Sequence, residues 1–425
     1  MMQGPEAAVP ALARPIIVAA ALAYFAVVAA IGAWASRRTR TAGDFFVAGR
    51  SIGVIPLALA AMAATLSGFA FIGGPGLVYR AGFGAMYIVL SAGITGALGA
   101  WVLGRRLRAL GVARGLITVP DAIGARYGSR LAHGLAAAAL LVAVTGYMAT
   151  NILALGVVVD EIFGVGRGAG IWIGMGITLA YSAAGGIRAG IYTDIFQGAL
   201  MALASSLVFL FALDAGGGLA GISRTILAAD PDFLGPWGQL APLTGLSFFF
   251  VFALGSLGQP HVVHKFYMLR DARQLRWYPL LMTSAMLLTL LLYFAVGVAV
   301  KALVARGELE PLANPDAATP AFLLRFTPLL LAALVFSGVA AAIMSTLNSF
   351  MNVGAAALTH DLPVTVGRRV RNELRWGRVA TIGLSVAAAL VAQLSGTLVA
   401  FLGIFGFGLF ASTLVPALAI GLNWE

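Results

Sequence analysis

The residues of this sequence with the clearest chemical potential are hydroxyls placed among small apolar residues. Ser345 and Thr346 are adjacent in the run 337–349, and alanines separate them from Ser337. Small residues allow a second backbone to approach, and hydroxyl and carbonyl oxygens are ligands that a hard cation accepts without a full charge. Because hydroxyls in membrane helices also bond back to their own helix, the run by itself fits either a cation site or plain helix packing.

Asp194 is the one acidic residue that the hydropathy pattern places clearly inside an apolar span. It follows a Gly185-Gly186 pair and precedes Gln197 by about one helical turn, on the same side of the helix. A carboxyl group inside a membrane is costly and points by default to a functional role. The alternative is that Asp194 lies near the inner surface, where water hydrates it or Arg188 pairs with it.

Signatures of catalysis are missing from the sequence. It contains no cysteine and no Walker lysine motif, and the glycine-rich stretch 164–168 lacks the preceding strand and the acidic residue of a dinucleotide-binding loop. No nucleophile–base pair stands out. The four histidines, His133, His261, His264 and His360, occur singly, which argues against a clustered metal site. The sequence therefore predicts a protein that is not an enzyme and that carries no cofactor.

Two apolar spans are interrupted by small and polar residues, and these breaks would position the polar groups. One span covers about 52–79 and is interrupted at 63–68, and the other covers about 246–266 and is interrupted at 255–261. Unwound backbone survives in a membrane only where it lines a cavity or is buried in protein, and its free carbonyls can bind a cation and a polar solute. His261, in the second break, fits either a proton relay or a residue that holds the broken backbone in place.

The composition is that of a polytopic helical membrane protein. The chain has 425 residues, of which 60% are hydrophobic and 10% charged, and its mean hydropathy is +0.96. The net charge of +11 does not indicate nucleic-acid binding, because the basic residues lie between apolar spans, where they set the topology. We expect a multi-pass protein of the cell (inner) membrane whose partners are the lipid bilayer, a small solute and a cation.

Eleven apolar spans are expected, with the N-terminus outside and the C-terminus in the cytoplasm. Most of the 27 lysines and arginines then fall in inner loops, among them Arg37, Arg38, Arg105 and Lys265. The first span is too long for the apolar core of a signal peptide and is followed by arginines, which favours a retained helix over a cleaved leader. The spans are roughly 15–36, 52–78, 83–104, 132–156, 168–184, 189–213, 243–263, 278–303, 328–357, 377–395 and 397–422.

The spans divide into one extra helix and two halves. Residues 1–40 hold the extra N-terminal helix, 49–215 hold five helices and 243–423 hold five more, so a single all-α membrane domain is expected. An odd number of spans per half makes the second half sit upside down relative to the first. The two interrupted spans are then the first helix of each half, an arrangement that points to a binding site at the membrane midplane.

In these features the sequence resembles the sodium:solute symporter family, the group that contains proline permease and the sodium/glucose transporters. The matching motifs are Gly-Gly…Thr-Asp…Gln at 185–197, Gly-Gln-Pro-His at 258–261, Ile-Met-Ser-Thr at 343–346, Val-Pro-Asp…Arg-Tyr-Gly at 119–128 and Ala-Gly-Arg-Ser-Ile-Gly at 48–53. The resemblance covers roughly residues 40–425. It implies a LeuT-like core of five plus five inverted helices behind the extra helix, with Na⁺ as the coupling ion and no other cofactor or metal.

The resemblance also implies which residues bind sodium. Carried onto this sequence, the site uses the carbonyls of Ala63, Leu66 and Ala342 and the hydroxyls of Ser345 and Thr346. Asp194 matches a family aspartate that supports this site or lies on the exit route of the ion. Some relatives bind a second sodium with a serine where this chain has Ala342, so one sodium is expected here.

The solute pocket carries over as seven uncharged residues. They are Thr65, Ser67, Phe69, Tyr147, Phe252, Ser256 and Gln259. The proline-permease branch has an aspartate at the position of Thr65 and a tryptophan at that of Phe252, so its substrate does not transfer directly. An uncharged pocket favours a small zwitterion or neutral solute held by helix dipoles and the Tyr147 hydroxyl.

The sequence thus predicts a sodium-coupled symporter that imports a small organic solute by alternating access, an amino acid such as proline or a similar small polar molecule. Three alternatives stay open: a sodium/monocarboxylate symporter, coupling to protons in place of sodium, and a transporter-like membrane module of a signalling protein. The oligomeric state, with a monomer as one option, and a natural chain that continues past Glu425 also stay open.

Overall fold

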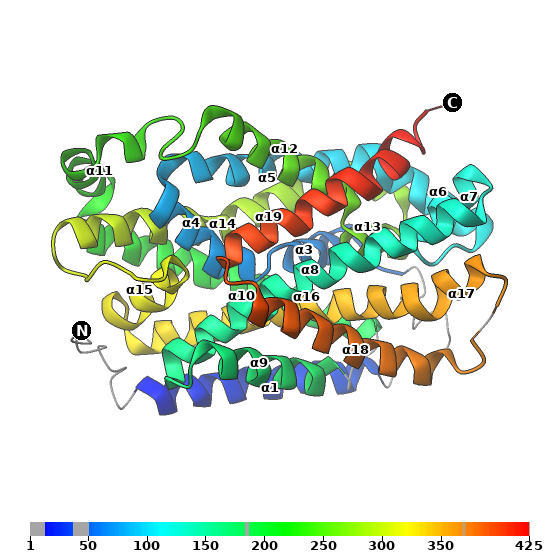
Figure 1. The fold of residues 1–425 in the computed structure, drawn as a ribbon, viewed down its shortest axis with the longest axis horizontal. Helices are drawn as coiled ribbons and strands as arrows, with labels where there is room; N and C mark the ends of the chain where they lie inside the picture. Colours follow the sequence, from blue (N-terminus) through cyan, green and yellow to red (C-terminus); the bar gives the residue numbers. More distant parts are fainter. Residues whose placement is uncertain (1–12, 37–50, 183–186, 369, 425) are drawn as a thin grey trace.

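The computed structural model describes residues 13–36, 51–182, 187–368 and 370–424 (Figure 1). Within these ranges the secondary structure is helical, and the one β-type pairing is an isolated bridge between Ile52 and Leu269. The expected all-α architecture is therefore confirmed. Arg37, Arg38 and the Gly185-Gly186 pair lie outside the described residues.

The helices divide into α-helices (α) and short 3₁₀- or π-helical stretches (η). The first half of the chain contains, in order, α1 (Ala13–Ser36), α3 (Val54–Thr65), η2 (Phe69–Gly73), α4 (Gly74–Ala81), η3 (Gly82–Ala85), α5 (Met86–Leu98), η4 (Gly99–Gly104), α6 (Arg105–Arg114), α7 (Val119–Tyr127), α8 (Arg130–Phe163), α9 (Arg167–Ser182) and α10 (Ile187–Gly216). The second half contains α11 (Gly218–Ala229), η5 (Pro231–Leu234), α12 (Pro242–Gly258), α13 (Pro260–Val263), η6 (His264–Met268), η7 (Ala272–Arg276), α14 (Tyr278–Ala305), η8 (Pro315–Ala317), α15 (Ala318–Phe326), α16 (Leu329–Ala356), η9 (Ala357–Asp361), α17 (Leu362–Thr365), α18 (Glu373–Leu394), α19 (Val399–Leu409), η10 (Phe410–Leu414) and η11 (Pro416–Ile420).

Each expected span coincides with one helix or with a few consecutive helices. By length and hydropathy alone, seven helices in the described ranges could cross a membrane, or eight if the bent pair α12 and α13 is one span. The apolar part of α1, 15–31, and the helix α3 are shorter than such a span. A polytopic membrane protein is confirmed, and the full count of eleven spans stays a prediction.

Most of the long helices run along the longest axis of the molecule (Figure 1). α11 and α15 lie at one end of this axis, and α6, α7 and α17 lie at the other. α8 and α16 pass through the middle of the view, with α1, α9 and α18 below them and α5 and α12 above. The short helix α3 packs against α10, α14 and α16, so it lies in the interior of the bundle.

The first break comes directly after α3. Leu66 has extended backbone (φ −83°, ψ 113°), and the chain returns to helix through the π-helical turn η2. Gly68 lies where α8 and α16 press against the break, and a Cβ there would be 2.6 Å from the Ala154 Cβ and 2.9 Å from the Ile343 Cγ1. Only a residue without a side chain fits this approach. The interruption expected over 63–68 is confirmed, and its unwound part is the second half of that range.

The second break separates α12 from α13. α12 ends at Gly258, Gln259 is extended (φ −70°, ψ 102°), α13 begins at Pro260, and the two parts are bent by 49°. Proline suits the first position of a helix because an N–H there would have no partner within the helix. A Cβ on Gly258 would lie 2.5 Å from the Phe410 carbonyl oxygen, so this break is also packed tightly. The interruption expected over 255–261 is confirmed.

Two backbone hydrogen bonds join the residues ahead of α3 to those behind η6. The Ile52 N–H donates to the Met268 carbonyl over 3.2 Å, and the Arg270 N–H donates to the Ile52 carbonyl over 2.8 Å. Together they form the isolated bridge between Ile52 and Leu269. The two broken helices are therefore held next to each other at this end.

Candidate ion and solute site

The hydroxyls of Ser345 and Thr346 meet carbonyl oxygens of α3. Ser345 Oγ lies 3.0 Å from the Ala63 oxygen and 3.1 Å from the Ala342 oxygen. Thr346 Oγ1 lies 3.1 Å from the Ala64 oxygen and 2.9 Å from the Ala342 oxygen. Both hydroxyls are buried, at 2% and 0% exposure. Four of the five residues expected to bind sodium are thus brought together by the packing of α16 on α3.

The break explains why these carbonyls are available. In an unbroken helix the Ala64 oxygen would accept a hydrogen bond from the N–H of Gly68. Here that N–H donates to Asn151 Oδ1 on α8 over 3.0 Å. Asn151 is fully buried, and its Nδ2 donates to the Tyr147 carbonyl over 2.9 Å. The sequence analysis missed Asn151, because nothing in its local pattern shows that it faces the break.

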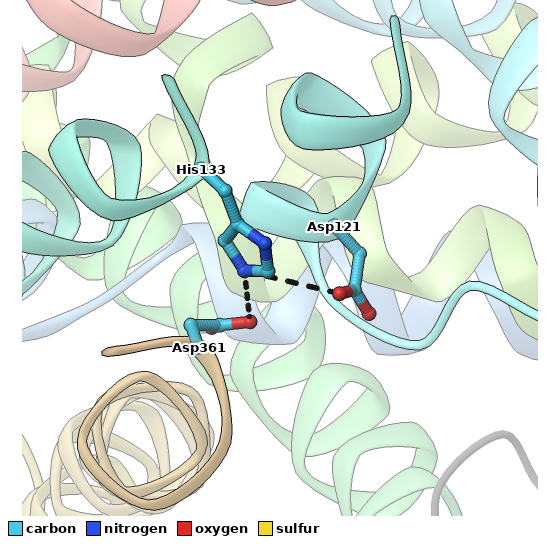
Figure 2. Close-up of side chains that lie close together, drawn as sticks. All are labelled: Asp121, His133 and Asp361. Carbon is cyan, nitrogen blue, oxygen red and sulfur yellow. Dashed lines mark hydrogen bonds and ion pairs between the residues drawn. The ribbon is translucent and has the colours of Figure 1, made fainter. Parts of the chain in front are cut away.

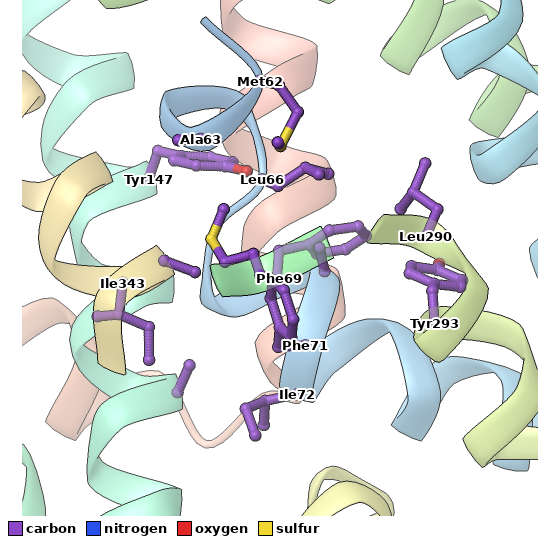
Figure 3. Packing of buried hydrophobic residues seen from close by; sticks show 14 of the residues in the cluster. Met62, Ala63, Leu66, Phe69, Phe71, Ile72, Tyr147, Leu290, Tyr293 and Ile343 are labelled. Atoms are coloured by element: carbon purple, nitrogen blue, oxygen red, sulfur yellow. The ribbon is translucent and has the colours of Figure 1, made fainter. Parts of the chain in front are cut away.

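Leu66, the fifth residue of the expected set, lies in the unwound part of the break. Its N–H donates to the Met62 carbonyl over 2.9 Å, and its side chain is buried at 4% exposure. Figure 3 shows its side chain close to those of Met62 and Ala63. No hydrogen bond among the described residues joins Leu66 to Ser345 or Thr346, so its carbonyl stays a predicted ligand.

His261, in the second broken helix, contacts the backbone of the first break. Its Nε2 lies 3.0 Å from the Ala64 oxygen, and because a carbonyl only accepts, Nε2 carries the proton. The ring also packs on Phe350, with 4.0 Å between the ring centres. Of the two interpretations of His261 given above, this contact favours the one in which it holds the broken backbone. It also makes Ala64 a member of the site that sequence reasoning missed.

Asp194 forms a buried ion pair with Lys265. Asp194 Oδ2 and Lys265 Nζ are 2.9 Å apart, and the two residues are 3% and 5% exposed. The expectation that Lys265 lies in an inner loop is wrong, because its amine is drawn into the bundle by the carboxylate. The side chain of Arg188, the alternative partner, is not among those described.

The ion pair lies one helical turn from the contact between α10 and α3. Gly198, four residues after Asp194, packs on α3, where a Cβ would be 3.1 Å from the Leu59 oxygen and 3.4 Å from the Ala63 Cβ. Asp194 therefore lies about one helical turn away from the contact between α10 and α3. Gln197, expected on the same side as Asp194, instead donates from Nε2 to the Tyr24 hydroxyl of α1.

Aromatic rings close the space between the two breaks. The Phe252 ring stacks on Phe69 with 5.1 Å between ring centres and on Phe407 with 4.3 Å. Tyr147 meets the edge of Phe407 at 5.3 Å, and Figure 3 shows Tyr147, Phe69 and Tyr293 around the first break. Phe69, Tyr147 and Phe252 of the expected pocket are therefore brought together, and Phe407 and Tyr293 are neighbours that the sequence did not reveal.

The polar groups of the expected pocket differ in how they are used. Ser67 Oγ and Tyr147 Oη share a hydrogen bond of 2.9 Å. Thr65 Oγ1 donates to the Ala61 carbonyl and Ser256 Oγ to the Ala253 carbonyl, so both hydroxyls bond back to their own helices.

Gln259 has unused hydrogen-bonding capacity. Its side chain is fully buried, and neither Oε1 nor Nε2 has a partner among the described residues. The Tyr293 hydroxyl, whose ring lies 6.1 Å from that of Phe69, is in the same situation. A buried polar group without a partner is destabilising, so such groups call for an explanation. A polar ligand between the broken helices would supply the missing partners.

The comparisons with known proteins give matches to transporters. The family model described as "SSF: Sodium:solute symporter family" matches residues 45–425. The sodium/pantothenate symporter of Escherichia coli (strain K12) is 28% identical over 415 residues, which cover 95% of this chain and 85% of that protein. The high-affinity proline transporter PutP of Bacillus subtilis (strain 168) is 28% identical over 410 residues, covering 93% and 84%.

A solved structure has the same fold. A Na⁺-coupled sialic acid symporter in a substrate-bound outward-open state aligns with a TM-score of 0.78 at 17% identity, over 96% of this chain and 98% of that one. At this identity the likeness shows the fold alone. That fold is the inverted-repeat architecture expected from the sequence.

Proposed function

The chain belongs to the sodium:solute symporter family, and from this we propose that it carries a small organic solute across the membrane together with Na⁺. The observation that carries the proposal is the contact of Ser345 and Thr346 with the carbonyls of Ala63 and Ala64. At this buried contact, two hydroxyls from α16 meet carbonyl oxygens at the end of α3. These are neutral oxygen ligands, which suit a hard monovalent cation.

In the structure, hydrogen bonds from the hydroxyls of Ser345 and Thr346 link α16 to α3. In the proposed mechanism a bound Na⁺ takes over this link. The hydroxyls of Ser345 and Thr346 would turn their lone pairs toward the ion, and the carbonyls of Ala63 and Ala342, with that of Leu66, would complete the shell. Binding then fixes the first break in the conformation that presents Ser67 and Phe69 to the solute. Each ligand tightens the binding of the other by the same factor, as linkage requires.

The membrane potential supplies part of the driving force. One positive charge crossing about 100 mV is worth roughly 2.3 kcal/mol, which corresponds to about a fifty-fold accumulation of solute before any sodium gradient is added. Asp194 and Lys265 are neutral as a pair, so they add no net charge beside the route of the ion. We propose for Asp194 a supporting role at the sodium site or on its exit route.

We propose a small zwitterion or neutral molecule as the solute, bound between Ser67, Tyr147 and Gln259 on the polar side and Phe69 and Phe252 on the apolar side. The unpaired amide of Gln259 offers two donors and an acceptor for such a molecule. Thr65 and Ser256 are included as pocket residues whose hydroxyls can leave their own helices.

The relatives support solutes of this size, since two are named for proline and pantothenate. A carboxylate such as pantothenate is therefore the second candidate.

We further propose that residues 49–215 and 243–423 are inverted repeats behind the extra helix within 1–40, with the N-terminus outside. The two broken helices support this, because α3–η2–α4 and α12–α13 occupy corresponding places in the two halves. Lysine or arginine tagging of the loops with membrane-impermeant reagents would test the orientation.

The test of the function is uptake into proteoliposomes with and without an inward Na⁺ gradient. A panel of proline, other small amino acids and pantothenate is offered to the wild type, to Thr346→Ala and to Thr178→Ala. Thr178 is the matched control, because it is equally buried and, among the described residues, its hydroxyl bonds only to the Gly174 carbonyl of its own helix. We expect Na⁺-dependent uptake in the wild type and Thr178→Ala, and its loss in Thr346→Ala. Uptake that ignores Na⁺ and follows a proton gradient would reject sodium coupling.

A further inference from the structure

Three side chains that could bind a metal ion meet at the end of the bundle that holds α6, α7 and α17. His133 at the start of α8 has its Nε2 3.0 Å from Asp361 Oδ1 and 3.8 Å from Asp121 Oδ1. One ligand atom from each of the three residues lies within 4.8 Å of those of the other two. Figure 2 shows the imidazole between the two carboxylates. Histidines that occur singly in the sequence are therefore not isolated in space, and the argument from their scattering against a metal site fails.

Each of the three groups comes from a different element. Asp121 is in the first turn of α7, where it forms a capping box with Thr118. Asp361 closes the π-helical stretch η9 that follows α16, and His133 lies one turn into α8. Because these elements are far apart in the sequence, only the packing of the whole bundle creates the cluster.

The two carboxylates bring negative charge into this buried place, where their partners are two imidazoles and neutral hydrogen-bond donors. Asp361 is 1% exposed and the Asp121 side chain 16% exposed. Among the described residues, the ion-pair partners of both are imidazoles, His133 and His360, and no lysine or arginine reaches either one. Buried carboxylates are stable only when they are paired or coordinate a metal. A divalent cation would balance both charges at once.

We propose that His133 Nε2, Asp121 Oδ1 and Asp361 Oδ1 form a binding site for a divalent transition-metal ion of the Zn²⁺ class. The ligand atoms have the right spacing. Three ligand atoms that all lie within 4.8 Å of one another have a common point about 2.8 Å or less from each of them. Zinc binds histidine nitrogen at about 2.0–2.1 Å and carboxylate oxygen at about 2.0–2.2 Å. Shifts of several tenths of an ångström therefore complete the site.

The groups behind the ligands already hold them in place. Asp121 Oδ2 accepts the N–H groups of Ile117 and Thr118 over 3.3 and 3.2 Å, and its Oδ1 faces His133 and His360. Asp361 Oδ1 accepts the Thr118 hydroxyl over 2.8 Å and has a second lone pair. Such partners are what orient the ligands in metal sites. His360, with Nε2 3.6 Å from Asp121 Oδ1, lies next to the site.

A metal ion bound here fastens α7 to α8 and η9. The connection continues, because the Tyr267 hydroxyl of η6 donates to the Thr118 carbonyl over 3.2 Å. Metal occupancy therefore holds the inner half of the second broken helix, by way of α7, against α8 and η9. We expect the bound metal to slow the conformational cycle without touching the solute pocket.

The test is a titration of the purified, tag-free, full-length protein, stripped with a chelator, with Co²⁺ as a spectroscopic probe and Zn²⁺ as a competitor. The wild type should bind one equivalent of Co²⁺ with visible ligand-field absorption that Zn²⁺ removes. Asp361→Asn and His133→Gln should bind at least about tenfold more weakly, the loss expected for one ligand or its orienting partner. Asp232→Asn, which removes an exposed carboxylate on η5, is the matched control and should bind like the wild type.

A second measurement covers the case in which one of these variants does not fold. It compares thermal unfolding with and without Zn²⁺. The wild type should gain thermal stability on adding Zn²⁺, and Thr118→Val, which keeps all three ligands, should gain stability too. Wild-type protein that shows neither absorption nor stabilisation overturns the proposal and leaves a cluster held by a proton on His133. Equal binding by wild type, Asp361→Asn and His133→Gln overturns it as well. Neither measurement depends on transport, so the result is independent of the function proposed above.

Discussion

Lys265 Nζ lies 2.9 Å from Asp194 Oδ2, and the two side chains are buried together between α10 and η6. α10 packs directly on α3, whereas η6 continues the second broken helix. The ion pair therefore connects α10, which packs on the first broken helix, to η6 at the end of the second broken helix. Taking either charge away leaves the other one buried alone.

We predict that Asp194→Asn destabilises the protein by about 3–5 kcal/mol, the usual result of removing one partner of a buried pair. The double variant Asp194→Asn/Lys265→Gln should recover much of this loss, because no charge remains unpaired. Thermal unfolding in detergent measures both. The control is Asp230→Asn, which breaks the Lys301–Asp230 pair; both of its side chains are 26% exposed, so a loss below about 1 kcal/mol is expected. Equal losses at the two pairs would contradict the interpretation.

Gly68→Ala should fold poorly or transport slowly. The new methyl would lie 2.6 Å from the Ala154 Cβ, closer than carbon atoms approach, and overpacking of this kind costs about 1–3 kcal/mol. Adding Ala154→Gly removes the closest clash but leaves the Ile343 Cγ1 at 2.9 Å, so it should restore part of the lost stability. Gly93→Ala on α5 serves as control, since nothing lies within 4 Å of a Cβ there. If Gly68→Ala and Gly93→Ala unfold at the same temperature, the close approach is not a constraint.

Phe252→Leu should weaken solute binding more than sodium binding. The ring stacks between Phe69 and Phe407, and losing these contacts should raise the half-saturating solute concentration about tenfold, the equivalent of about 1.4 kcal/mol. Na⁺ binding measured without solute should change by less than about twofold. Phe294→Leu, at a ring that packs edge-on against Phe83, is the matched substitution outside the pocket. A parallel loss of solute and Na⁺ binding in Phe252→Leu would show a general collapse of the site.

Asp316 should make stability depend on pH. Burial raises the pKa of Asp316 to about 6, against the opposing effects of the Val399 N–H, which donates to Oδ2 over 2.8 Å, and of the Arg167 charge. A carboxyl group whose pKa is higher in the folded than in the unfolded protein stabilises the fold below about pH 4. This stabilisation is lost as the pH rises to about 6, and about 3 kcal/mol is the upper scale of the loss.

The measurement for Asp316 is the difference in unfolding temperature between the wild type and Asp316→Asn over pH 4 to 8. The wild type should lose stability relative to the variant between about pH 4 and 6 and show a constant difference above that range. Asp232→Asn, at an exposed carboxyl group, should follow the wild type throughout. A difference that does not vary with pH would mean that Asp316 is not buried as described.

The parts of the fold that the sequence predicted well are those that depend on local composition. The breaks at 63–68 and 255–261 were predicted because glycine, proline and polar residues interrupt apolar runs. Thr346 was singled out because two adjacent hydroxyl residues are unusual within an apolar span. Bringing Ser345 to Ala63 took the family resemblance, since 282 residues separate them, and the contact of Thr346 with Ala64 was missed.

Other features could not be derived from the sequence. Lys265 was placed in a loop because a basic residue after an apolar run normally marks the membrane surface, and its partner Asp194 lies 71 residues away. The cluster of His133 and Asp361, separated by 228 residues, was missed for the same reason. In each case the pairing follows from how whole helices pack, which local pattern does not encode.

The bridge between Ile52 and Leu269 bears on how the transporter can move. The Ile52 N–H donates to the Met268 carbonyl, and the Ile52 carbonyl accepts from the Arg270 N–H. The chain just ahead of α3 is therefore hydrogen-bonded to the end of η6. Two half-helices joined in this way would move together rather than independently. A movement of α3 away from Ser345 and Thr346 that kept these two hydrogen bonds would also shift η6, and with it Lys265 relative to Asp194.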